Sequence, residues 1–137
     1  MGLADTRFSN RRRALAATLA AQRIDAILVT DLTHMRYLTG FSGSNGALLL
    51  RKDLSAVVTT DGRYTTQIAE DVPDIKATIQ RRVGPKLLEG LEGPQRVGFE
   101  AAYVSVEEFK KLEEACPEDI TLVPVSGVIE KQREKKD

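Results

Sequence analysis

The chain has 137 residues, which suits a single domain with one hydrophobic core. Its 20 basic and 20 acidic side chains balance, which argues against nucleic acid as a partner. One cysteine excludes an internal disulfide and a cysteine-rich zinc site, and no apolar run approaches the roughly 20 residues of a membrane span, so we expect a cytoplasmic protein with no membrane partner.

The chain begins with an amphipathic pattern. Residues 7–22 place apolar side chains at helical spacing, and the alanines among them favour a helix. Arg11, Arg12 and Arg13 cannot all face a core, so we expect this end of the helix to be exposed. Residues 26–29 form a continuous apolar run, which predicts a strand buried on both faces.

A long connection, residues 31–46, separates this strand from the next. It contains His34, the only histidine, and three glycines, Gly40, Gly43 and Gly46. A connection of this length between buried strands is unusual unless it has a function. Glycine permits positive φ or the close approach of another backbone. We therefore interpret the connection as a functional loop and the rest of the chain as its scaffold.

The later segments alternate between strand and helix patterns. Residues 47–50 and 56–59 predict a hairpin. Asp61 is a plausible N-cap for a helix over residues 63–69, with Gly62 at a sharp turn before it. The period-two alternation of residues 75–80 predicts a half-buried strand.

The last third of the chain continues this alternation. We expect a short helix near residues 85–91, a strand at 96–99 and a final strand at 120–123, with a helix between these strands. That helix begins at the capping-box pattern from Ser105 to Glu108. The fold class is therefore α/β, with a mixed, partly antiparallel central sheet flanked by helices.

The residue types restrict the chemistry that the chain can perform. With one histidine and one cysteine, the usual zinc combinations fail. Asp31 and Asp61 could hold Mg²⁺ or Mn²⁺, although roles in a turn and a cap explain them better. A small hydrolase that uses His34 with Ser42 or Asp61 is a weaker hypothesis. The residues alone thus indicate a shaped surface loop without a complete catalytic set.

Four passages resemble a known family: residues 24–31, 36–44, 59–67 and 97–100. The second reads Arg-Tyr-Leu-Thr-Gly-Phe-Ser-Gly-Ser and the third Thr-Thr-Asp-Gly-Arg-Tyr-Thr-Thr-Gln. In order and spacing the passages are similar to the N-terminal domain of the creatinase/prolidase/Xaa-Pro aminopeptidase metallopeptidases. The resemblance covers nearly the whole chain.

The resemblance implies a two-domain peptidase that hydrolyses the bond preceding proline. Its C-terminal domain would hold two divalent metals (Mn, Co or Zn) with two Asp, one His and two Glu. None of these ligands is assigned to this chain, so we expect no catalytic residue and no metal here, and no activity from the chain alone. Residues 1–130 would be the N-terminal domain, and residues 131–137 would start the linker to the catalytic domain.

The resemblance also implies that this domain contacts its own catalytic domain, supports a homodimer or homotetramer and controls access of the peptide substrate. The corresponding loop is residues 31–37, which makes His34 and Arg36 candidate substrate-access residues. The simpler interpretation of His34 is an exposed loop residue. The other motif residues are expected to be structural: Tyr37, Gly40, Gly43, Asp61, Gly62, Arg63 and Tyr64. The alternative function is a stand-alone binding or regulatory module that kept the fold without peptidase activity.

Overall fold

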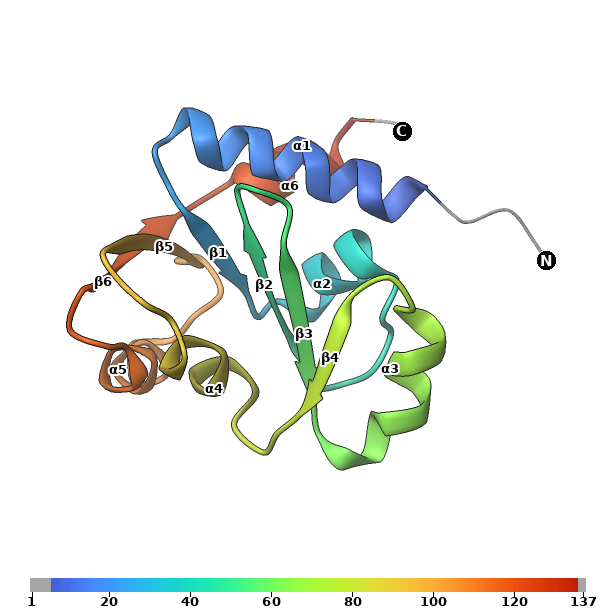
Figure 1. The fold of residues 1–137 in the computed structure, drawn as a ribbon. Coiled ribbons are helices and arrows are strands. Elements are labelled where there is room, and N and C mark those ends of the chain that lie inside the picture. Colours follow the sequence, from blue (N-terminus) through green and yellow to red (C-terminus); the bar gives the residue numbers. More distant parts are fainter. Residues whose placement is uncertain (1–5, 136–137) are drawn as a thin grey trace.

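The centre of the molecule is a mixed six-stranded sheet. A computed structural model describes residues 6–135 and gives the strand order β4-β3-β2-β1-β5-β6 (Figure 1). Strands β1–β2 and β2–β3 pair antiparallel, whereas β1–β5, β3–β4 and β5–β6 pair parallel, which confirms the expected mixed sheet. The strands are β1 (Ala26–Val29), β2 (Ala47–Arg51), β3 (Ala56–Thr60), β4 (Lys76–Ile79), β5 (Gln95–Glu100) and β6 (Ile120–Val125).

Helices cover both faces of this sheet and make a three-layer domain (Figure 1). One layer contains α1 (Arg7–Ala21), α2 (Leu32–Thr39), α3 (Thr65–Asp71) and α6 (Val128–Arg133). The other contains α4 (Val83–Glu89) and α5 (Val106–Ala115). A 3₁₀ turn, η1 (Gly62–Tyr64), precedes α3. None of the helices within residues 6–135 is long and apolar enough to cross a membrane.

The central strand β1 contributes side chains to the hydrophobic cores on both faces of the sheet. Successive side chains of a strand point to opposite faces. Accordingly, Ile27 and Val29 enter the core beneath α1 and α2, whereas Ala26 and Leu28 enter the core beneath α4 and α5. All four residues are buried, as the apolar run predicts. The end of β1 is therefore held from two sides, which gives the segment after it a fixed starting point.

The connection over residues 31–46 contains a helix, so the expectation of one long loop was wrong. Asp31 caps α2 by accepting a hydrogen bond from the Thr33 amide (3.0 Å). Gly40 ends the helix in the left-handed conformation, at φ 87°. Met35 and Leu38 point into the core and are fully buried. An N-cap, a C-terminal glycine and two core side chains are sufficient to specify this short helix.

The arginine run at the start of α1 is not uniformly exposed. Arg12 is buried, and its guanidinium donates to the Leu38 carbonyl (2.8 Å) and forms an ion pair with Asp74. Arg12 thus fixes α1 against the last turn of α2. The expectation that this end of the helix would be exposed was wrong for Arg12, because Arg12 has a buried carbonyl and a carboxylate to pair with.

The edge strand β4 is more exposed than its sequence pattern predicts. Strand β4 confirms the expected strand, but it forms an edge and has no buried residue, and Ile79 is 41% exposed, so the expectation that the strand would be half-buried was wrong. At the end of the described chain, α6 extends across residue 130 to Arg133. Gln132 donates to the Arg11 carbonyl (2.9 Å), which packs α6 against α1. The domain boundary at residue 130 stays a prediction.

Candidate functional site

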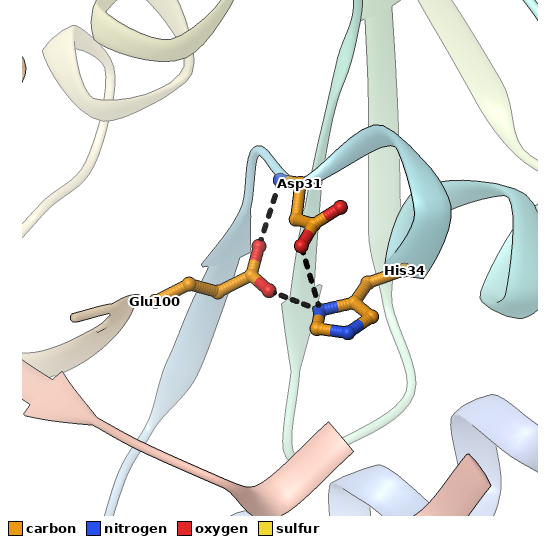
Figure 2. A group of neighbouring side chains, drawn as sticks. All are labelled: Asp31, His34 and Glu100. Carbon is orange, nitrogen blue, oxygen red and sulfur yellow. Dashed lines mark hydrogen bonds and ion pairs between the residues drawn. The ribbon is translucent and has the colours of Figure 1, made fainter. Parts of the chain in front are cut away.

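The carboxyl ends of β1 and β5 bring three polar side chains together. The two strands are parallel neighbours, so their carboxyl ends meet at the same edge of the sheet. Glu100 is the last residue of β5, Asp31 follows β1 as the cap of α2, and His34 lies in the first turn of α2. We call these three residues the strand-end cluster. Figure 2 shows both carboxylates directed at the imidazole.

Glu100 connects the end of β5 to the start of α2. Its Oε1 accepts hydrogen bonds from the main-chain amides of Thr30 (2.8 Å) and Asp31 (2.9 Å). Its Oε2 shares a hydrogen bond with His34 Nδ1. Burial raises the pKa of Glu100 above its ordinary 4.5, while the bonds from the Asp31 amide and from His34 act in the opposite direction. The cluster therefore holds a buried carboxyl group whose proton affinity depends on its partners.

Asp31 completes the cluster from the solvent side. One of its oxygens, Oδ1, is occupied by the Thr33 amide, and Oδ2 lies 3.7 Å from His34 Nδ1. Each carboxylate therefore uses one oxygen to fix the backbone and presents the other to the imidazole. The side chain of His34 is only 4% exposed, so the interpretation of His34 as an exposed loop residue was wrong.

A small cavity of about 110 Å³ adjoins the cluster. The three cluster residues line it together with Tyr103 and with residues of α6, among them Glu130. His34 Nε2 has no hydrogen-bond partner among residues 6–135, and it points away from the two carboxylates toward α6 (Figure 2). The cluster is therefore buried and yet borders a space that can admit water or an ion.

The donor set of the cluster suits a cation. One ligand atom from each of Asp31, His34 and Glu100 lies within 4.8 Å of the others. The structure does not bring His34 to Ser42 or Asp61, because Ser42 receives a hydrogen bond from Gln67 and Asp61 pairs with Asn45 and Arg63. The hypothesis of a hydrolase built on those pairs has no geometric support among the described contacts.

The other motif residues hold the glycine-rich loop, residues 40–46. Asp61 caps η1, accepts from Asn45 Nδ2 (2.8 Å) and pairs with the Arg63 guanidinium through both carboxylate oxygens (3.0 and 2.8 Å). These bonds, from Arg63 first and then Asn45, hold the pKa of Asp61 well below its usual range. Thr60 Oγ1 donates to the Asn45 carbonyl. The loop is thus tied to the end of β3.

The two motif tyrosines are in different environments. Tyr64 packs edge-on against Phe41, with ring centroids 5.8 Å apart, and shares a hydrogen bond with Ser44. The centre of the Tyr37 ring lies 4.4 Å from the guanidinium carbon of Arg11, and the Tyr37 hydroxyl accepts a hydrogen bond from the side chain of Gln132. Tyr64 thus supports the glycine-rich loop, whereas Tyr37 joins α2 to α1 and α6.

The remaining predicted site residues are Arg36, on the surface of α2, and two motif glycines, Gly43 and Gly62. Arg36 is exposed on the surface of α2, so it is available to a partner or ligand. Gly43 has no room for a β-carbon, which would meet the Phe41 ring at 2.3 Å. Gly62, in contrast, has an ordinary φ and open space around it, so nothing in the described structure demands glycine there.

The glycine-rich loop also borders a second cavity, of about 270 Å³, between the loop and helices α4 and α5. Ser44, Asn45 and Gly46 form its wall on the loop side. Thr30 also lines this cavity, and its Oγ1 is buried without a hydrogen-bond partner among the described residues. The loop and the strand-end cluster therefore flank the same end of β1.

Sequence reasoning missed Glu100 as a site residue. It identified the residue only as part of a family strand end, because no local pattern shows which strand lies beside β1. A usable signal was present: a carboxylate ends an otherwise apolar strand, at the edge where open α/β sheets place their sites. Asp31 and Asp61 were considered together as metal ligands, but Asp31 lies beside His34 and Asp61 pairs with Arg63, so the structure gives them different partners.

The fold and the cluster define a three-layer α/β domain with a polar group at the carboxyl ends of two parallel strands. The chain belongs to the Creatinase/Prolidase N-terminal domain family, whose model matches residues 11–135. The expected family and fold are thereby confirmed. Among curated proteins, the chain is 33% identical over 116 residues to the uncharacterized peptidase YqhT of Bacillus subtilis (strain 168). This match covers 80% of the chain but only 31% of YqhT.

Solved structures of similar proteins agree with this assignment. The N-terminal, creatinase/prolidase-like domain of a predicted metallopeptidase from Corynebacterium diphtheriae is 58% identical, with a TM-score of 0.88 over 90% of this chain and 99% of that one. The N-terminal domain of the cytoplasmic peptidase PepQ from Mycobacterium tuberculosis H37Rv is 43% identical, with a TM-score of 0.84 over 89% and 97%. An Xaa-Pro aminopeptidase chain from Streptococcus pyogenes is 30% identical, with a TM-score of 0.79 over 91% and 96%.

Proposed function

We propose that this chain is the N-terminal domain of a cytoplasmic Xaa-Pro peptidase and that it contributes to assembly and substrate access. The observation that carries the proposal is the 43% identity to the N-terminal domain of a cytoplasmic peptidase over 89% of the chain. The Xaa-Pro specificity is supported by the name of the S. pyogenes relative. The chain spans about a third of YqhT, which leaves most of that relative without a counterpart here.

The peptidase reaction itself is assigned to polypeptide other than the described residues. The resemblance implies that five side chains of the catalytic domain would hold two divalent metals, which would supply an activated water for hydrolysis. The strand-end cluster offers three ligand atoms, two fewer than that pair requires. The residues described here do not fit the metal pair, and their proposed contribution is to bind and orient rather than to hydrolyse.

Arg36 is the proposed substrate-access residue. It is exposed on α2, and a guanidinium can form a charge-assisted, two-point pair with the carboxylate of a short peptide. His34 is buried on the same helix and has the role of positioning α2 through Glu100. Of the two candidate substrate-access residues, Arg36 is thus proposed to contact the substrate and His34 to position α2.

The test uses the natural gene product that contains this chain, assayed on Xaa-Pro dipeptides with added Mn²⁺. We expect hydrolysis by that product, none by residues 1–137 alone, and an increase in KM of roughly tenfold on Arg36→Gln with kcat unchanged. Arg81, an exposed arginine before α4, supplies the matched control in Arg81→Gln. A gene product without Xaa-Pro activity would favour the alternative, a binding module that kept only the fold.

Assembly is tested separately, on the isolated chain. Size-exclusion chromatography with light scattering should show a dimer or tetramer. A strict monomer at every concentration would contradict the role in assembly, whatever the outcome of the peptidase assay.

A further inference from the structure

We propose that Asp31, His34 and Glu100 form a binding site for a divalent transition-metal ion, with Zn²⁺ as the best-fitting ion. The site lies within this chain, and its three ligands come from the end of β1, the first turn of α2 and the end of β5. The proposal does not rest on the peptidase activity proposed above, since it concerns only contacts within residues 6–135.

The first argument is the convergence of three ligand atoms, two of which, His34 Nδ1 and Glu100 Oε2, share a hydrogen bond in the absence of metal. Asp31 Oδ1 and Glu100 Oε1 are held by main-chain amides, which leaves Oδ2 and Oε2 directed at His34 Nδ1 (Figure 2). Ligands of bound metals are usually oriented in this way, by hydrogen bonds to the atoms that do not bind the metal. The backbone of β1 and α2 therefore prepares both carboxylates for a shared cation.

The second argument is charge. Two carboxylates approach one imidazole, and no lysine or arginine among the described residues forms an ion pair with either carboxylate. Buried charges are ordinarily paired or bound to metal. Glu100 is the buried carboxylate of the two, and Asp31 is partly exposed. A proton on the imidazole compensates one negative charge, whereas a divalent ion compensates both.

The third argument is access. The side chain of His34 is 4% exposed, but the cluster borders the cavity of about 110 Å³ beside α6. That space, which all three ligands line, can hold the water molecule that would complete a four-coordinate site. Figure 2 shows Nε2 of His34 directed away from both carboxylates, and His34 lines the cavity, so a water there could accept the Nε2 hydrogen when Nδ1 binds the metal.

The donor set selects the class of ion. One imidazole nitrogen with two carboxylate oxygens suits Zn²⁺, at nitrogen and oxygen distances of about 2.0–2.2 Å. Mg²⁺ prefers octahedral oxygen ligands and is expected to bind poorly. Mn²⁺ should bind more weakly than Zn²⁺, in line with the general order of affinities. On binding, the proton shared by His34 Nδ1 and Glu100 Oε2 leaves to solvent, and the metal takes its place between these atoms.

The experiment uses the tag-free 137-residue chain, titrated with Zn²⁺, Mn²⁺ or Mg²⁺ by calorimetry in two buffers of different ionisation enthalpy. We expect one Zn²⁺ per chain and proton release. Because His34 is the only histidine, the imidazole ¹⁵N spectrum reports this residue alone. Zn²⁺ should shift the Nδ1 resonance and leave Nε2 protonated.

Variants locate the site and keep the test independent of folding. Asp31→Asn preserves the helix cap, since asparagine caps as well as aspartate, and it should weaken Zn²⁺ binding at least about tenfold. His34→Gln should do the same. Asp61→Asn, which changes another capping aspartate, and Cys116→Ser, which removes the only thiol, should leave the affinity unchanged.

Three results would overturn the proposal. The first is no saturable Zn²⁺ binding with Kd below about 1 mM. The second is binding that survives Asp31→Asn and His34→Gln but disappears in Cys116→Ser. The third is coordination through Nε2 instead of Nδ1, since Nε2 faces away from both carboxylates.

Discussion

The side chains of His34 and Glu100 share a buried hydrogen bond although 66 positions separate them in the sequence. Glu100 also accepts the amides of Thr30 and Asp31, so a single carboxylate fixes both the end of β1 and the first turn of α2. This arrangement depends on the parallel pairing of β1 with β5, which aligns the two strand ends. The position of α2, and with it that of Arg36, is therefore set by a residue from a distant part of the chain.

The first prediction concerns Glu100. Glu100→Ala leaves two amides and the imidazole without their acceptor, so the free energy of unfolding should fall by roughly 2–3 kcal/mol. Glu100→Gln keeps one acceptor oxygen for the amides and should cost roughly 1 kcal/mol. Urea denaturation at pH 7 measures both. Equal losses in the two variants would show that the carboxyl group has no specific role in holding α2.

The second prediction separates two neighbouring arginines. Arg12→Ala leaves the buried Leu38 carbonyl without its donor and Asp74 without its partner, so we expect a loss of roughly 2–4 kcal/mol. Arg13 is exposed, and its guanidinium donates a hydrogen bond to Asn10 on its own helix, so Arg13→Ala should change stability by less than roughly 0.5 kcal/mol. Thermal denaturation of the two variants gives the comparison. A smaller effect for Arg12 than for Arg13 would contradict the described packing of α1.

The third prediction is a pH dependence that originates at Asp61. Arg63 and Asn45 stabilise its charged form and lower its pKa, so the folded state binds this proton less readily than the unfolded chain. The resulting stabilisation is complete above the unfolded pKa of about 4 and is lost as the pH falls through the folded value. Stability of the unmodified chain should therefore fall between neutral and strongly acidic pH.

Asp61→Asn isolates this contribution. The variant lacks the titrating group, so its stability should depend less steeply on pH below about 4 than that of the unmodified chain. Urea midpoints measured at a series of pH values provide the two curves. Parallel curves would mean that other carboxylates cause the acid sensitivity. Arg63→Gln, which removes the main partner of Asp61, should reduce the slope in the same direction.

Local patterns in the sequence were sufficient for the scaffold. The apolar run of β1, the hairpin of β2 and β3, and the helix cap at Ser105 each depend on residues that are close in sequence, and each is present in the structure. Of the expected capping box, the bond from the Glu108 amide to the Ser105 hydroxyl is the half that the structure shows. The helix α2 was missed although its cap, Asp31, and its terminal glycine, Gly40, are visible in the sequence. The glycines further along the segment favour a loop, whereas the two capping residues specify the helix.

Long-range pairings could not be derived from local patterns. Arg12 is buried because Leu38 and Asp74, 26 and 62 positions away, provide its acceptors. His34 is buried because β5 lies beside β1, and its partner Glu100 comes from that strand. Composition and periodicity show which side chains are polar, but only the strand order shows which of them meet. The resemblance to a family supplied the fold but no partner for His34.

The final prediction contrasts two glycines that both lie in family motifs. Gly40 has φ 87°, and a β-carbon there would approach the Phe8 ring at 3.0 Å, so Gly40→Ala should cost roughly 1–2 kcal/mol. Gly62 has an ordinary φ and open space, so Gly62→Ala should be neutral or should stabilise by up to about 1 kcal/mol, because alanine restricts the unfolded chain. Chemical denaturation distinguishes the two. Stability gives no reason for glycine at position 62. If Gly62→Ala lowered the peptidase activity of the natural gene product that contains this chain, with stability unchanged, the turn would lie at a contact with substrate or with another domain.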